Sequence, residues 1–180
     1  MKKNVFYHVM MLAMIAVVSM TFTACGGDSD DDGTPQVPTG PTGSTEYFDP
    51  CLDFGSSQSH VKEYMSGSNW ELSEHSNEAV LLYTNIQTMT VLNYIFIESK
   101  LHMVTVAYTG GESKAQAFKA EIEKRHGVTM TRLDDPSDAS QYGYYATVTI
   151  GGKQVVITLS YYKGGISIVY GLPDWQGYEE

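Results

Sequence analysis

Apolar and polar residues alternate with a period of two over much of the chain beyond residue 70, and this pattern predicts β-strands with two unlike faces. In residues 91–97, for example, Leu92, Tyr94 and Phe96 fall on one face. Comparable runs predict strands at residues 70–72, 79–83, 91–97, 101–108, 128–133, 142–150, 154–162 and 166–170. Gly151 and Gly152 stand between two of these runs, where a two-residue hairpin turn needs positive φ.

Two stretches change from strand to helix periodicity. Val61, Tyr64 and Met65 have the spacing of one helical face, which predicts a short helix over residues 57–66 with Ser56 or Ser57 as N-cap. A second helix is predicted over residues 114–126, with Ser113 as N-cap of a capping box and Gly127 as its C-terminal stop.

The elements therefore follow the order helix, four strands, helix, four strands. We predict an α+β fold with an antiparallel sheet of about seven to eight strands in two meanders, because the connections are too short for parallel crossovers. Each meander is preceded by a helix, and we expect both helices on one face of the sheet and a duplicated α-β unit. The order resembles small envelope lipoprotein modules of the BamE-like kind, and is similar to the helix-plus-meander repeat of the β-lactamase inhibitor protein.

The N-terminal residues have the pattern of a secretory signal. Lys2 and Lys3 precede the apolar run of residues 9–18, which is shorter than the roughly 20 residues of a membrane-spanning helix. Small residues then lead to Cys25, although Phe22 stands where lipoprotein signals usually have Leu. We predict a signal peptide over residues 1–24 and a lipid on Cys25; an uncleaved anchor helix is the alternative interpretation.

An acidic cluster follows Cys25 directly and consists of Asp28, Asp30, Asp31 and Asp32. Cysteine and cluster together resemble the surface lipoproteins of Bacteroidetes-type bacteria. The resemblance implies that the cluster is an export signal and that the protein is lipid-anchored in the outer membrane at the cell surface. A periplasm-facing protein with a plain acidic linker is the alternative. The Asp pattern also imitates a calcium loop, but Thr39 stands where an EF-hand needs Glu.

Residues 25–44 form the predicted tether, because Gly, Asp, Thr, Pro and Ser dominate them and they cannot bury a core. Residues 45–180 form the single predicted domain. If Cys25 is lipidated, Cys51 is the one remaining thiol of the chain, so no intrachain disulfide is expected. A buried structural cysteine is the expected role of Cys51.

Composition and motifs argue against several functions. The formal net charge of −10 disfavours nucleic acid as a partner. Common hydrolase, nucleotide-binding and metal-ligand motifs are missing from the sequence, so we expect no catalytic residues, no cofactor and no metal. One catalytic arrangement stays open: carboxylates that meet only in space. Its candidates are Glu71, Glu74, Glu78 and Glu98.

Tyrosine is the positive feature, with 13 in the chain and many near its C-terminus. We predict a non-enzymatic domain that binds a glycan or protein ligand through exposed aromatic rings. The candidate ligand-binding residues are Tyr142, Tyr144, Tyr162, Tyr170 and Trp175. The simple preference of tyrosine for strands is the competing explanation. The alternative function is a module for envelope assembly or inhibition that contacts a protein.

Overall fold

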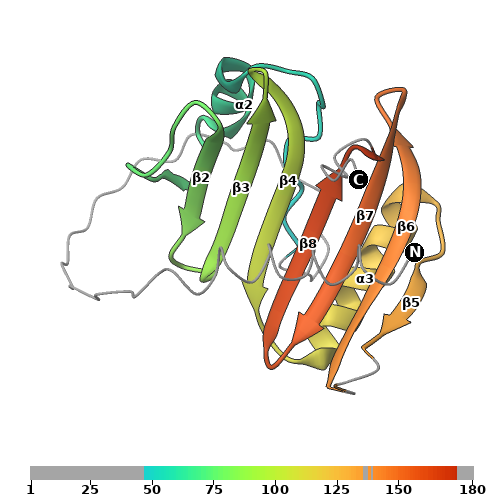
Figure 1. The fold of residues 1–180 in the computed structure, drawn as a ribbon. Helices are drawn as coiled ribbons and strands as arrows, with labels where there is room; N and C mark the ends of the chain where they lie inside the picture. Colours follow the sequence, from blue (N-terminus) through green and yellow to red (C-terminus); the bar gives the residue numbers. More distant parts are fainter. Residues whose placement is uncertain (1–46, 136–137, 139, 174–180) are drawn as a thin grey trace.

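The computed structural model describes residues 47–135, 138 and 140–173 (Figure 1). The predicted signal peptide, lipidation site, acidic cluster and tether lie outside the described residues, as does Trp175. The described elements run in the order α2 (Gln58–Met65), β1 (Glu71–Leu72), β2 (Val80–Asn85), β3 (Thr90–Ile97), β4 (Lys100–Thr109), α3 (Glu112–His126), β5 (Thr131–Asp134), β6 (Gln141–Ile150), β7 (Lys153–Tyr162) and β8 (Gly165–Gly171).

All eight strands form one antiparallel sheet in the order β1-β2-β3-β4-β8-β7-β6-β5. Two meanders of neighbouring strands therefore meet at the pair β4 and β8, where Val104 lies opposite Tyr170 and Val106 opposite Ile168. The prediction of an α+β fold with an antiparallel sheet is confirmed. The pairing of β4 with β8 joins the two meanders into a single sheet, so β8, the last of the described strands, lies near the centre.

The helices begin close to their predicted positions, with one correction. The Ser57 side chain caps α2 by accepting a hydrogen bond from the His60 N–H. Helix α3 begins earlier than predicted, with Gly111 as N-cap and Ser113 inside the first turn. The predicted capping box is therefore wrong, because the Gly111 carbonyl already accepts from Lys114 N and Ala115 N. Gly127 ends α3 in the left-handed conformation, with φ of 63°.

Strand β5 is the other element whose extent differs from the prediction. It begins at Thr131 and not at Val128, because the chain before it hydrogen-bonds to helix α3. Val128 N donates to the Glu123 carbonyl at 3.1 Å, and Met130 N donates to Glu123 Oε1 at 2.8 Å. The hairpin between β6 and β7 is as predicted, with positive φ at Gly151 and Gly152 and with Ile150 opposite Lys153.

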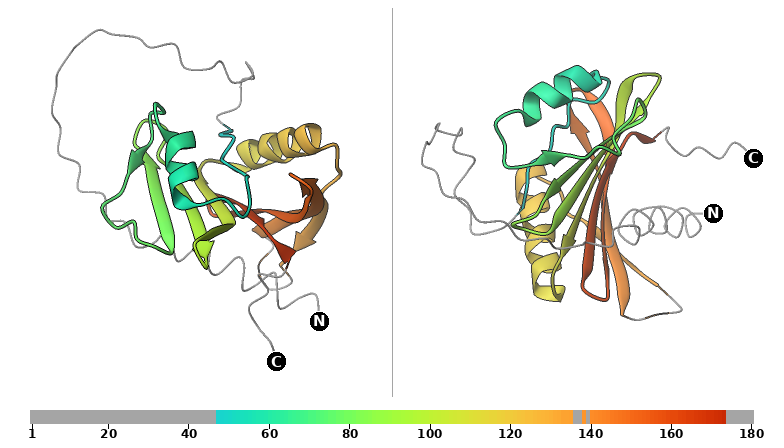
Figure 2. Two further views of the ribbon diagram at one scale, coloured as in Figure 1. Left: turned by 90° about the horizontal axis from the view of Figure 1, so that it is seen from above. Right: turned by 90° about the vertical axis from the view of Figure 1, so that its left-hand side faces the viewer.

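The main core contains side chains from the sheet, from both helices and from the chain before α2. Val61 and Met65 come from α2, and Ala115, Phe118 and Ile122 come from α3. Every second residue of the long strands joins them; Leu92, Val104, Val106, Ile157, Leu159 and Ile168 are among those with 0 to 1% exposure. Figure 2 shows the helices beside the twisted sheet from two directions.

Candidate functional site: a tyrosine-bound strap and a sheet face with little charge

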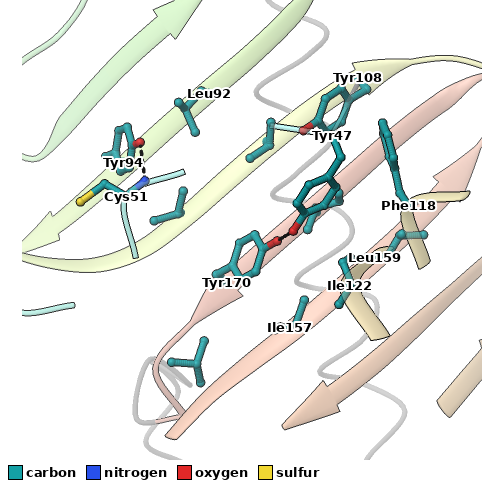
Figure 3. Packing of buried hydrophobic residues seen from close by; sticks show 14 of the residues in the cluster. Tyr47, Cys51, Leu92, Tyr94, Tyr108, Phe118, Ile122, Ile157, Leu159 and Tyr170 are labelled. Atoms are coloured by element: carbon teal, nitrogen blue, oxygen red, sulfur yellow. Dashed lines mark hydrogen bonds between the residues drawn. The ribbon is translucent and has the colours of Figure 1, made fainter. Parts of the chain in front are cut away.

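Residues 47–55, which we call the strap, form no helix or strand but are held tightly by tyrosine side chains of the sheet. The hydroxyls of Tyr47 and Tyr170 are hydrogen-bonded to each other (Figure 3). The backbone N–H groups of Phe48 and Cys51 donate to the hydroxyls of Tyr108 at 3.1 Å and Tyr94 at 3.0 Å. Three tyrosines from β3, β4 and β8 thus satisfy polar groups of a partly buried segment that has no ladder of its own.

Helix α3 holds the first part of the strap through one arginine. The guanidinium of Arg125 lies 4.8 Å from the centre of the Tyr47 ring and 3.0 Å from the Asp49 carboxylate. Glu121, one turn earlier, binds the same guanidinium at 2.7 Å. The ring of Tyr47 also packs edge-on against Phe118. Charge, ring stacking and apolar packing therefore act on the same few strap residues.

Burial makes these phenols poor acids. It raises the pKa of Tyr47 to about 12, and it raises the pKa of Tyr94, Tyr108 and Tyr170 above the ordinary value for the same reason. A catalytic phenolate would need the opposite shift, so these tyrosines serve as neutral hydrogen-bonding groups. The sequence showed them only as alternating strand residues, and no local pattern indicated their shared role.

The structure corrects the predicted aromatic binding surface. Tyr142, Tyr144 and Tyr170 are buried in the main core, with 3%, 5% and 0% exposure, so they cannot offer an exposed surface to a ligand. The reason is register: Tyr142 and Tyr144 share a face of β6 with the buried Ala146. Tyr162 lies on the other face of the sheet and is half-buried. The centre of its ring is 4.7 Å from the ammonium of Lys163.

The carboxylates that the sequence offers for chemistry lie at the surface of the described residues. Glu71, Glu74, Glu78 and Glu98 are all exposed. Among the described residues, no group of three or more His, Cys, Asp or Glu side chains could hold a metal ion. No helix in the described ranges is long and apolar enough to span a bilayer.

Cys51 is a free cysteine and is buried, with 3% exposure, as expected from the sequence. Burial raises the pKa of its thiol, which lowers the fraction of reactive thiolate. Its backbone N–H is bound to the Tyr94 hydroxyl, so the residue is part of the contact between strap and sheet. This environment is that of a structural cysteine rather than of a nucleophile.

A second feature is the face of the sheet whose residues alternate with those of the main core. We call it the outer face. On the six strands β2, β3, β4, β8, β7 and β6 its uncharged residues are Val80, Leu82, Thr84, Val91, Asn93, Ile95, Ile97, Met103, Thr105, Ala107, Thr109, Gly165, Ser167, Val169, Gly171, Gln154, Val156, Thr158, Ser160, Tyr162, Gln141, Gly143, Tyr145, Thr147 and Thr149. Among the strand residues of this face only Lys100 of β4, opposite Ile97, and Glu71 of β1, opposite Thr84, are charged, although the chain carries a net charge of −10.

The outer face has an apolar part and a polar part. Met103 and Val169 form a second buried apolar cluster with Ile95, separate from the main core. Toward β7 and β6 the face becomes rich in threonine, and Thr147 and Thr149 are exposed. Such a surface has little to hold an ion or to activate water, but it can exclude water against another surface with little charge.

No protein family model matches this chain, and no curated protein is similar to it in sequence.

Proposed function

We propose that this chain is an exported, lipid-anchored protein whose α+β domain binds another protein and catalyses no reaction. The outer face, on which Lys100 and Glu71 are the only charged strand residues described, is the observation that carries the proposal. The whole chain has 21 acidic and 11 basic side chains in 180 residues, and charged side chains normally lie on solvated surfaces. A sheet face with so little charge is typical of a surface that is desolvated against a partner.

The arrangement of the layers supports this choice of surface. Both helices and the strap contribute to the main core, and none of their residues belongs to the second cluster of Ile95, Met103 and Val169. We infer that both helices cover one face of the sheet and leave the outer face to a partner. The order of helix and meander, repeated once along the chain, supports a duplicated α-β unit as the origin of this arrangement.

A protein fits this surface better than a glycan does. Sugar rings are bound by exposed aromatic rings flanked by polar groups, and three of the five predicted aromatic residues are buried. Apart from the half-buried Tyr145 and Tyr162, the outer face presents mainly β-branched and small residues, which pack against another protein surface. Envelope assembly or inhibition of an enzyme is the kind of role that such a module performs.

The proposed location of the protein at the outer membrane rests on the sequence. Small residues precede Cys25, and an acidic cluster follows it, which consists of Asp28, Asp30, Asp31 and Asp32. This pattern supports a protein that is exported and held in the outer membrane by a lipid on Cys25. Replacing Cys25 with Ser tests the anchor directly, because a lipidated chain partitions into membranes and the variant should not. A Cys25→Ser chain that stays in the membrane fraction would contradict the anchor.

The binding proposal is tested by charge placed on the outer face. Val156 and Thr158 are half-buried residues of β7, and we expect Val156→Glu with Thr158→Glu to abolish capture of a specific envelope protein after cross-linking in cells. The matched control is Ala120→Glu, which adds the same kind of charge on the exposed side of α3. Equal capture by the two variants would contradict the proposal.

A glycan array separates the two kinds of ligand. Saturable glycan binding that is lost in Tyr162→Ala or Trp175→Ala would favour the glycan alternative over the protein partner. Turnover of any substrate in a broad hydrolase screen would overturn the non-enzymatic function.

A further inference from the structure

Half of strand β6 has a neighbour on only one side. Strand β5 pairs with residues 142–145 of β6, and this pairing ends where Thr131 lies opposite Tyr145. Residues 146–150 continue as a strand and pair with β7 alone, from Ala146 opposite Ile157 to Ile150 opposite Lys153. We call residues 146–150 the open edge; it is the part of β6 that continues beyond β5 toward the turn into β7 (Figure 1).

The chain that precedes β5 does not close this edge. Its N–H groups at Val128 and Met130 are used by Glu123 of α3, through the carbonyl and the carboxylate respectively. Within the described residues, hydrogen bonds to the backbone of the open edge come from β7 only. In an antiparallel ladder every second residue points its N–H and C=O away from its partner strand, so the open edge presents unpaired groups.

The opposite end of the sheet shows how this chain closes an edge elsewhere. Strand β1 has only two residues, but the chain after it continues to bind β2. Ser73 N donates to the Leu82 carbonyl at 2.8 Å, and the Ser76 hydroxyl accepts from Leu82 N at 3.0 Å. Asn77 N donates to the Val80 carbonyl at 2.8 Å. The edge of β2 is therefore covered well beyond the short ladder of β1.

The side chains of the open edge also lack the usual protection. Exposed edges are commonly guarded by charged residues or proline, which discourage pairing with another chain. The open edge reads Ala146, Thr147, Val148, Thr149 and Ile150, without charge or proline and with four β-branched residues in a row. Strand β5 differs, because it carries Arg132 and Asp134.

We propose that the open edge is a dimerisation site, at which two copies of this chain pair their β6 strands antiparallel about a two-fold axis through Val148. This register places Thr147 opposite Thr149 of the second copy and Ala146 opposite its Ile150. The length of the open edge fits this pairing, because the open edge ends at the β5 pairing of Tyr145 on one side and at the turn of Gly151 on the other.

Charge favours a second copy of this chain as the partner of the open edge. Two chains with a net charge of −10 repel each other over most of their surfaces, but the open edge brings no charged strand residue against another. A two-fold contact is self-complementary, so each threonine pair forms twice and the two sheets become one. The inference does not depend on the proposed function, because the dimer uses the edge of β6 and the partner protein uses the outer face.

Cysteine cross-linking tests the register on the full chain with Cys25→Ser. Chains with Thr147→Cys and chains with Thr149→Cys are mixed and oxidised, and we expect a disulfide-linked dimer in the mixture. Either variant alone should cross-link far less. Each new thiol then lies diagonal to the same cysteine of the second copy, which is too far away for a disulfide. The control is Gln154→Cys, an exposed residue of β7 opposite Thr149, which should give no cross-linked dimer.

Sedimentation at increasing concentration tests the dimer itself. Thr147→Lys with Thr149→Lys places like charges opposite each other twice and should lower the association constant by about tenfold or more. Gln154→Lys with Thr158→Lys adds the same charge to β7, one strand inward, and should leave association unchanged. A chain that stays monomeric at every concentration overturns the inference. So does a dimer whose association constant is unchanged by the two lysines on β6, or one that cross-links equally well in the Gln154→Cys control.

Discussion

The hydroxyl of Tyr94 accepts a hydrogen bond from the backbone N–H of Cys51 at 3.0 Å, across 43 residues of sequence. The same hydroxyl donates to the sulfur of Met65 at 3.3 Å. One side chain from the centre of β3 therefore contacts both the strap and helix α2. Since the strap has no ladder, its position depends on such contacts, and they give a direct way to test how the two parts of the fold are joined.

Replacing Tyr94 with Phe removes the hydroxyl and keeps the ring. The Cys51 N–H then stays buried without an acceptor, and we expect the free energy of unfolding to fall by about 1–3 kcal/mol. Urea denaturation followed by circular dichroism measures this change. The matched control is Tyr83→Phe, because Tyr83 is also buried, packs against the Tyr94 ring, and has no hydrogen-bond partner for its hydroxyl among the described residues. If Tyr83→Phe lowers the free energy of unfolding as much as Tyr94→Phe does, the Tyr94 hydroxyl does not have this role.

Replacing Arg125 with Ala should loosen the strap at its other end. The guanidinium stacks on Tyr47 and binds Asp49 and Glu121, and its side chain is only 20% exposed. We expect the free energy of unfolding to fall by about 1–2 kcal/mol, since partly desolvated stacking and pairing are stronger than at the surface.

Arg132 provides the control for that variant. It also stacks on a tyrosine ring, at 4.7 Å from the centre of Tyr142, and pairs with Asp134, but its side chain is 49% exposed. Arg132→Ala should change the free energy of unfolding far less than Arg125→Ala does. Equal losses for Arg125→Ala and Arg132→Ala would show that the strap contact contributes nothing beyond a surface ion pair.

The strands were predictable because their physical signal is local. Alternation places Leu92, Tyr94 and Phe96 on one face, and paired glycines mark the turn at Gly151. The start of α3 was missed because a backbone carbonyl, that of Gly111, took the place of the expected Ser113 cap. Such errors are confined to the ends of elements, where several caps compete on nearly equal terms.

The functional surfaces were less predictable, because period-two alternation says which residues share a face but not which face is covered. Tyr142 and Tyr144 were assigned to an exposed surface, and the structure buries them. The strap was beyond sequence patterns altogether, since residues 47–55 have no periodicity. Its partners Tyr94, Tyr108 and Tyr170 lie 43, 60 and 123 residues away from the groups they bind.

Alkaline pH should destabilise the fold through its buried phenols. Burial raises the pKa of Tyr47 and of Tyr142 from 10.0 to about 12, so both stay protonated in the folded chain while the unfolded chain ionises. The folded state then binds more protons, and the free energy of unfolding falls as the pH rises from 10 to 12. Each such phenol contributes up to about 1.4 kcal/mol per pH unit. Urea denaturation at a series of pH values measures the slope.

Tyr47→Phe tests whether Tyr47 contributes to that slope. The variant loses the hydrogen bond to Tyr170 and should be less stable than the wild type at neutral pH. Because its residue 47 cannot ionise, the difference should narrow as the pH rises from 10 to 12. Parallel curves for the two proteins would mean that the Tyr47 phenol does not titrate in this range.

Cys51 reports on release of the strap. Its thiol is 3% exposed and its pKa is raised by burial, so in a Cys25→Ser chain a thiol-reactive dye should label the folded protein far more slowly than the unfolded one. Tyr94→Phe removes the acceptor for the Cys51 N–H and should speed labelling more than its effect on global unfolding accounts for. Arg132→Ala, remote from the strap, should leave the labelling rate unchanged. If labelling in Tyr94→Phe instead follows global unfolding alone, the strap opens only together with the whole domain.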